Sequence, residues 1–285
     1  TYPELYEWSV RNIPEFWEQV WHFTDIIHSQ SYNSIVDDPS RMPGATWFKG
    51  ARLNFAENLL RSRDNRPAIH FQGEGQTLRT LTHQELFYEV EKLAHALRDF
   101  GIQKGDRVAG FMPNMPETVI AMLATASIGA VWSSSSPDFG IKGVLDRFSQ
   151  IEPRIIFASN GYYYNGKEFD SLGKLWDILT ELPSVEKVIV TPYLSRDIDL
   201  SKHNNATIYS DFISDDPEPI TFEQLPFDHP LYIMYSSGTT GLPKSIVHGS
   251  GGTLIQHLKE LRLHTNLNQG DTIFYFTTCG WMMWN

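Results

Sequence analysis

The sequence predicts an α/β fold, with mixed, largely parallel sheets flanked by helices. The main observation is that from residue 65 onward short apolar runs alternate with helical patterns of ten or more residues. A strand followed by such a helix reaches its neighbour through a crossover, which pairs the two strands in parallel. The second observation is size, because 285 residues, 41% of them hydrophobic, provide enough apolar material for a large buried core.

The expected strands and helices follow one another closely. Thr82 and Glu85 have the spacing of a capping box, and Gly101 supplies the glycine that commonly ends a helix. Asn114 and Pro116 start a further helix. The expected strands are residues 68–71, 107–112, 130–133, 154–158, 187–191 and 231–234, and further helices are expected at 138–151, 171–182 and 254–261.

The first fifty residues differ from this pattern. Asn12 is expected to cap a helix whose apolar residues, from Ile13 to Trp21, recur at the spacing of a buried stripe. Residues 39–50 are rich in turn formers, so we place a boundary near residue 50, between a helical extension (1–50) and a larger unit (51–285). We interpret the tryptophans at positions 8, 17 and 21 as core residues.

Charge and cysteine content limit the possible partners. The chain has 23 basic and 34 acidic residues, and its net charge of -11 argues against nucleic acid or an anionic membrane as a partner. Cys279 is the single cysteine, which rules out an internal disulfide and favours a reducing, cytoplasmic location. The sequence also lacks a membrane-spanning apolar run, and residues 1–10 do not form a signal peptide. Nothing in the sequence predicts an oligomeric state.

The most informative segment is residues 235–245, Y-S-S-G-T-T-G-L-P-K-S, which directly follows the last expected strand. Glycines allow main-chain N–H groups to approach an anion, hydroxyls add donors, and Lys244 adds a positive charge. The segment therefore predicts a phosphate cradle that suits a nucleotide triphosphate. Its expected members are Ser236, Ser237, Gly238, Thr239, Thr240, Gly241 and Lys244.

The order of these residues excludes one kind of cradle. A Walker loop has four residues between its glycines and glycine directly before the lysine, whereas two residues separate Gly238 from Gly241 and Pro243 precedes Lys244. A Ser/Thr/Gly-rich surface turn is the plainer alternative, but a fixed order over ten positions favours the cradle.

The order S-S-G-T-T-G-L-P-K-S resembles the nucleotide loop of the acyl-adenylate-forming superfamily. Segments outside the loop narrow this resemblance to acyl-CoA synthetases, and within them to those that activate acetoacetate. These segments are residues 53–60, 105–108, 113–117, 124–131, 133–153 and 161–167. The resemblance implies that residues 51–285 form part of a large N-terminal AMP-binding domain, preceded by an extension of the acetyl-CoA synthetase type.

The activity implied by the resemblance has two steps. Acetoacetate attacks the α-phosphate of ATP, with Mg²⁺ assisting, to give acetoacetyl-adenylate and pyrophosphate. Coenzyme A thiolate then displaces AMP. Because a carboxylate must approach a polyanion, donors and metal have to neutralise the phosphates and hold the reacting groups in line.

The resemblance also assigns roles to individual residues. The cradle grips the β- and γ-phosphates, with Lys244, Thr240 and Trp281 as catalytic residues, and Trp281 flanks the acyl site. For Met282 and Trp284, beside it, composition predicts core packing. His248 hydrogen-bonds the loop or approaches a phosphate, or alternatively packs on the following helix. Lys167 stands where acetyl-CoA synthetases have an arginine for the 3′-phosphate of coenzyme A, although an exposed lysine on a turn is an equal alternative. No metal ligand is predicted in this chain.

Several elements of the family are expected to lie outside residues 1–285. They are the Tyr-Gly-x-Thr-Glu element that binds adenine and Mg²⁺, the hinge aspartate and the C-terminal domain with its lysine. We therefore expect the chain to be an N-terminal fragment that does not complete adenylation alone. Two alternatives are a ligase for another short acid, such as acetate or propionate, and a non-catalytic nucleotide-binding remnant.

Overall fold

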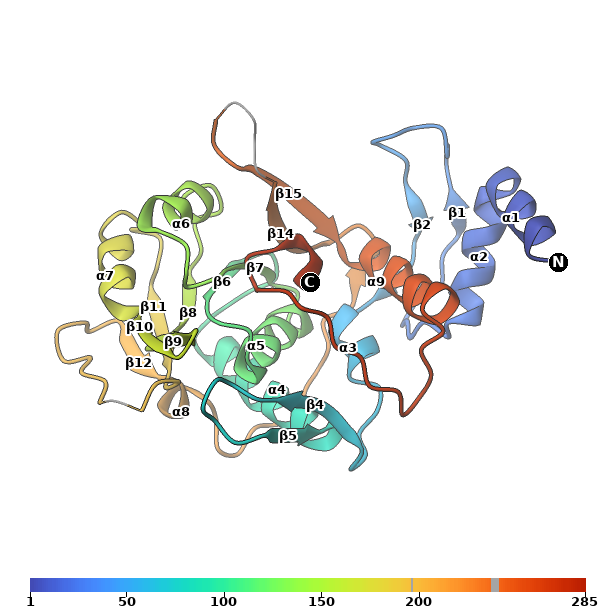
Figure 1. Ribbon diagram of the computed structural model, residues 1–285. Helices are drawn as coiled ribbons and strands as arrows, with labels where there is room; N and C mark the ends of the chain where they lie inside the picture. The colour runs from blue at the N-terminus through green and yellow to red at the C-terminus, as the bar shows by residue number, and fades with distance from the viewer. Residues whose placement is uncertain (196, 237–240) are drawn as a thin grey trace.

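The computed structural model describes residues 1–195, 197–236 and 241–285, and its centre is a seven-stranded sheet in the order β12-β11-β8-β6-β7-β14-β15 (Figure 1). Neighbouring strands are parallel from β12 to β14, and β15 is antiparallel to β14 at one edge. This confirms the predicted α/β class with a mixed, mostly parallel sheet. The strands are β6 (Arg107–Phe111), β7 (Val131–Ser135), β8 (Ile155–Ser159), β11 (Lys187–Thr191), β12 (Ala206–Ile208), β14 (Pro230–Ser236) and β15 (Lys244–Gly249).

Helices cover both faces of this sheet because its strands are apolar on both sides. On one face α4 (His83–Asp99) and α5 (Pro116–Ser127) share a core with Trp132 and Phe157. On the other face α6 (Ile141–Phe148) and α7 (Leu172–Thr180) pack on alternate strand residues such as Ile156 and Val190. As in any strand, successive side chains of β8 and β11 therefore point into different cores.

The remaining elements are short. The other helices are α1 (Tyr2–Arg11), α2 (Ile13–Phe23), α3 (Phe55–Leu59), α8 (Tyr209–Phe212) and α9 (Ser250–Lys259), with a π-helical turn η1 (Glu260–His264) and a 3-10 turn η2 (Met282–Trp284). The other strands form two-stranded sheets: β1 (Ser34–Val36) with β2 (Trp47–Lys49), β3 (Arg52–Leu53) with β13 (Leu225–Pro226), β4 (Pro67–Phe71) with β5 (Arg79–Thr82), and β9 (Gly161–Tyr164) with β10 (Lys167–Asp170).

The start and end signals of the helices are confirmed where they were strongest. Both halves of the Thr82 and Glu85 capping box form, and Gly101 adopts a φ of +95° just after α4. One strand assignment is wrong in its context: the expected strand 68–71 exists as β4, but it pairs antiparallel with β5 and not with the parallel sheet. The reason is that β5, which the sequence analysis missed, follows β4 with no helix between them. The two strands are therefore joined as a hairpin, and β4 has no crossover to the parallel sheet.

The N-terminal residues share the core of the sheet. Trp21 stacks on Phe48 with 4.9 Å between ring centroids, and Phe48 lies at the same distance from Phe227. Trp21 is 2% exposed, which confirms it as a core residue. The boundary near residue 50 stays a prediction, because residues on both sides of it belong to this one core.

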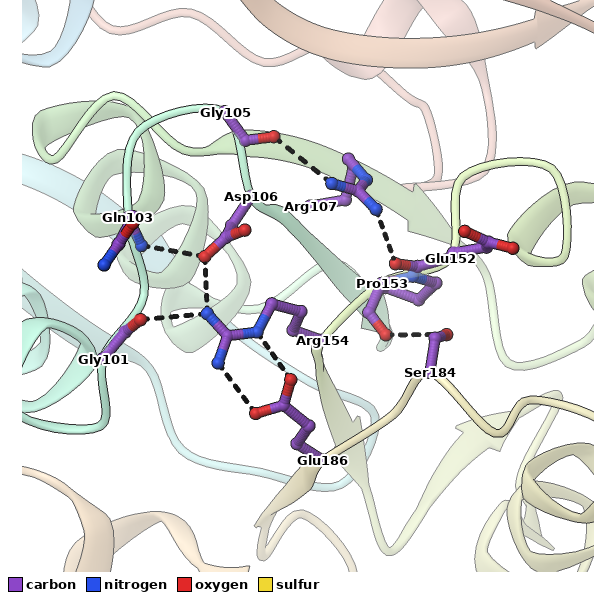
Figure 2. A network of polar contacts seen from close by, with 10 residues as sticks. All are labelled: Gly101, Gln103, Gly105, Asp106, Arg107, Glu152, Pro153, Arg154, Ser184 and Glu186. Carbon is purple, nitrogen blue, oxygen red and sulfur yellow. Dashed lines mark hydrogen bonds and ion pairs between the residues drawn. The ribbon is translucent and has the colours of Figure 1, made fainter.

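At the amino end of the sheet a charged network joins three strands (Figure 2). Arg154, Asp106 and Glu186 directly precede β8, β6 and β11. The guanidinium of Arg154 donates two hydrogen bonds to Glu186, at 2.7 and 2.8 Å, and one to Asp106, at 2.6 Å. It also donates to the carbonyl of Gly101 at 2.9 Å, so every strand start in this group is fixed by the same side chain.

In the described part of the chain, no helix combines the length and the apolar character that crossing a bilayer requires.

Candidate functional site

The predicted cradle lies in the connection between β14 and β15. β14 runs parallel to β7, so its last residue, Ser236, lies at the carboxyl edge of the sheet, where ligands of α/β folds bind (Figure 1). Ser236 and Lys244 are cross-strand partners, which brings the first and last residues of the cradle together. Ser237, Gly238, Thr239 and Thr240 lie outside the described residues.

Lys244 meets the first requirement for an anion site. Its side chain is exposed, and within the described residues it has no ion-pair partner. Gly241 is exposed too, and a Cβ built there would meet no described atom within 4 Å. Among the described residues, the hairpin thus presents an exposed cation that has no ion-pair partner.

The first arm of the hairpin is anchored by a buried phenol. The hydroxyl of Tyr235 donates to the carbonyl of Arg147 at 3.2 Å and lies 3.3 Å from the hydroxyl of Ser133, which donates to it. Burial raises the pKa of Tyr235 to about 12, so the phenol is neutral and keeps its proton as a donor near pH 7.

His248 lies on β15, against α9 and away from the hairpin end. It faces Tyr232 across the strand pair, and both line a cavity of about 420 Å³ together with His257 and Met282. Lys244 lies four positions earlier on the same strand, or roughly 13 Å away along the extended chain. Burial lowers the pKa of His248, which leaves the ring neutral at pH 7. These observations favour the packing alternative over a contact with phosphate.

The segment before Trp281 is docked on the carboxyl end of β7. Ser134 donates to the carbonyl of Cys279 at 2.6 Å, and a Cβ added to Gly280 would lie 3.1 Å from the amide nitrogen of Ser136. Trp281 itself is 54% exposed. Cys279 is buried, and burial raises the pKa of its thiol, as expected for a packed and unreactive cysteine.

One prediction in this segment is wrong. Met282 was expected in the core, yet it is 39% exposed and lines the cavity beside His248. Trp284 is partly buried as expected, and its indole N–H donates to Asn114 at 2.9 Å. Asn114 follows β6, so this bond ties the segment to the carboxyl edge of the sheet.

Lys167 lies apart from the hairpin. It begins β10, opposite Tyr164, and the turn between them is formed by Asn165 and Gly166, with φ of +51° and +72°. The carboxylate of Glu74 accepts from both turn amides, at 3.0 and 2.7 Å. The side chain of Lys167 is exposed, and the β9–β10 hairpin and the β14–β15 hairpin occupy different parts of the molecule (Figure 1).

The sequence analysis missed a row of hydroxyls at the carboxyl edge. Ser135, Ser159 and Thr191 end β7, β8 and β11, as Ser236 ends β14. The first three are buried, and their hydroxyls have no hydrogen-bond partner among the described residues. The available signal was a hydroxyl residue at the last position of successive predicted strands.

A mostly parallel sheet flanked by helices, with the Ser/Thr/Gly-rich sequence motif following a strand that ends at its carboxyl edge, is typical of adenylate-forming enzymes, and family comparison gives the same class. Residues 55–284 match the model for AMP-binding enzymes, and residues 2–59 match that for the N-terminus of acetyl-coenzyme A synthetase. The chain therefore belongs to the AMP-binding enzyme family.

Individual relatives narrow the comparison. The chain is 50% identical over 293 residues to acetoacetyl-CoA synthetase of Macaca fascicularis, covering 100% of this chain and 44% of the relative. It is 49% identical over 286 residues to acetoacetyl-coenzyme A synthetase of Rhizobium meliloti (strain 1021), with the same coverage. The solved structure of acetoacetyl-CoA synthetase from Streptomyces lividans superposes with a TM-score of 0.94 at 43% identity, covering 99% of this chain and 43% of that one. The chain thus spans less than half the length of these relatives.

Proposed function

We propose that the protein to which these residues belong joins acetoacetate to coenzyme A at the expense of ATP, through an acetoacetyl-adenylate. The observation that carries the proposal is the β14–β15 hairpin, which places the free cation of Lys244 beside Ser236 at the carboxyl edge of the sheet. The identity of 50% to an acetoacetyl-CoA synthetase supports the choice of acid.

In the first step a carboxylate oxygen of acetoacetate attacks the α-phosphorus of ATP, and the bond to the bridging oxygen breaks to release pyrophosphate. Charge on the leaving pyrophosphate grows as this bond breaks, so a fixed cation and fixed donors at the β- and γ-phosphates stabilise the transition state more than the ground state. We assign this role to Lys244 and Thr240, with Ser236, Ser237, Gly238, Thr239 and Gly241 as further phosphate-binding residues.

In the second step the thiolate of coenzyme A attacks the acyl carbon, the bond to the phosphate oxygen breaks, and AMP leaves. We propose that Trp281 flanks the acyl group, since its exposed ring follows a segment docked on β7. Lys167 stays a proposed ligand for the 3′-phosphate of coenzyme A, and the described chain does not bring it to the hairpin. For His248 we propose that the neutral ring packs in the cavity beside Tyr232 and does not bind a phosphate.

Mg²⁺ belongs to this proposal as the counter-ion of ATP. The described residues contain no group of three or more His, Cys, Asp or Glu side chains placed to hold a metal, so they do not fit a metal cage of their own. Mg²⁺ commonly binds through substrate phosphates with few protein ligands. We also propose a cytoplasmic location, on the ground that the single thiol is free and buried.

The test is acetoacetate-dependent exchange of pyrophosphate into ATP by the full-length protein. We expect exchange with acetoacetate to exceed that with acetate or propionate. Exchange with another short acid alone would move the assignment to that acid. ATP binding without any exchange would leave a non-catalytic nucleotide-binding protein.

A further inference from the structure

Gln150, which lies two residues beyond α6, holds the second arm of the nucleotide hairpin. Its amide nitrogen donates to the carbonyl of Pro243 at 2.9 Å. Its amide oxygen accepts from the hydroxyl of Ser245, also at 2.9 Å. Pro243 and Ser245 flank Lys244, so one side chain contacts both neighbours of the cation: the backbone carbonyl of Pro243 and the side-chain hydroxyl of Ser245.

The same end of α6 holds the first arm. Tyr235 is the cross-strand partner of Ser245, and its hydroxyl donates to the carbonyl of Arg147. The guanidinium of Arg147 lies over the Tyr235 ring, 5.6 Å from its centroid. Both strands of the hairpin are therefore attached to the end of α6 at one cross-strand pair, Tyr235 and Ser245.

Strand geometry explains how this attachment would act on Lys244. Side chains alternate along a strand, so a Ser245 that points to α6 directs Lys244 to the opposite face, where Ser236 also points. β15 is the last strand in the order of the main sheet, so no further strand of that sheet holds its outer side. Its orientation there depends on side-chain contacts, and Gln150 makes two of them.

We propose that Gln150 is a positioning residue for ATP: it sets the direction of Lys244 without touching the nucleotide. This inference rests on the proposed function, because it concerns the same hairpin. A surface glutamine without a structural role would not be expected to bind both neighbours of Lys244. Pro243 and Ser245 lie 93 and 95 positions after Gln150 in the chain.

The test compares two half-reactions of the full-length protein. In Gln150→Ala we expect acetoacetate-dependent pyrophosphate exchange to fall about tenfold, mainly through a higher KM for ATP, as both hydrogen bonds are lost. Thioester formation from supplied acetoacetyl-adenylate should not change, because no pyrophosphate leaves in that step. Ser245→Ala removes one of the two bonds and should have a smaller effect. The double variant should be no slower than Gln150→Ala, because the two residues act as a pair.

Lys142→Ala is the matched control, since Lys142 lies on α6, the helix that ends two residues before Gln150, is 85% exposed and among the described residues pairs with Asp146 alone. It should leave both half-reactions unchanged. Unchanged exchange in Gln150→Ala, or equal losses in both half-reactions, would overturn the inference.

Amide hydrogen exchange of residues 241–249 gives a readout that does not depend on activity. Gln150→Ala should speed exchange there and not in β11, and unchanged protection at 241–249 would also overturn the inference. If the unmodified protein showed no pyrophosphate exchange, the proposed function would fail, and hydrogen exchange would still decide whether Gln150 holds the hairpin.

Discussion

The two ends of the central sheet have different chemistry. At the amino end, charged residues precede β6, β8 and β11, and each finds a partner in the Arg154 network (Figure 2). At the carboxyl end, hydroxyl residues close β7, β8, β11 and β14, and three of them have no partner among the described residues. We interpret the amino end as the part that stabilises the fold and the carboxyl end as the part whose polar groups serve the proposed site. The first two predictions below test the two sides of this division, and the others concern packing and pH.

The largest expected effect is at the carboxyl end. Lys244→Ala in the full-length protein should slow pyrophosphate exchange about a hundredfold or more, because a fixed charge at the leaving group is lost. The free energy of unfolding should hardly change, since the side chain is exposed. Denaturant titration beside the exchange assay checks both statements, and an equal loss in thioester formation would contradict the phosphate role.

The reverse result is expected at the amino end. Arg154→Met should lower the free energy of unfolding by about 2 kcal/mol, because charge-assisted hydrogen bonds are lost and Asp106 and Glu186 are left facing each other. The exchange rate per folded molecule should stay near that of the unmodified protein. Lys142→Met, which breaks only an exposed pair, serves as the control and should cost less than about 0.5 kcal/mol. A strongly reduced exchange rate in folded Arg154→Met would break the division between the two ends.

Close packing at the start of α9 gives a smaller effect. A Cβ added to Gly251 would overlap the ring of Phe227, whereas one added to Gly252 would meet no described atom within 4 Å. Gly251→Ala should therefore cost about 1 to 3 kcal/mol through overpacking. Gly252→Ala should be neutral or slightly stabilising, because alanine favours a helix. Thermal melts of the two variants measure the difference, and equal melting temperatures would refute the packing argument.

The smallest effects are on the pH dependence of stability. Burial lowers the pKa of His248 and His257, so the unfolded chain binds more protons than the folded one below about pH 6.5, and stability should start to fall there. The hydrogen bonds from Arg154 lower the pKa of Glu186, so its contribution is present above about pH 4.5 and is lost only on further acidification. Denaturant titrations from pH 7.5 to 4 should resolve two windows. In His257→Gln the loss near pH 6.5 should become smaller, and an unchanged loss would exclude His257 as its source.

The sequence predicted those parts of the fold that depend on local signals. The capping box at Thr82 and the buried strand runs are written in neighbouring residues, and they proved correct. β15 was missed because it is mostly exposed and has no buried apolar run, and it forms by pairing with β14. β4 was assigned correctly as a strand but to the wrong sheet, because strand pairing depends on partners that periodicity does not identify.

The candidate site, like the fold, was predictable only where contiguous residues carry the signal. The motif proposes Lys244 and its hydroxyl neighbours as phosphate ligands, since an anion cradle uses contiguous residues, and these roles stay a prediction. Gln150 was not predictable, because its partners lie more than ninety positions away and a surface glutamine has no pattern of its own. Contacts across the sheet, and not the motif itself, place the cation.

The shared core of Trp21, Phe48 and Phe227 has a consequence for how the molecule melts. These rings come from α2, β2 and the segment before β14, so α2 and β2 cannot leave without exposing apolar surface that also belongs to the sheet. Heating should therefore disrupt α2, β2 and the sheet in one cooperative transition, with equal calorimetric and van't Hoff enthalpies. On this view α2 and β2 belong to the same folding unit as the sheet.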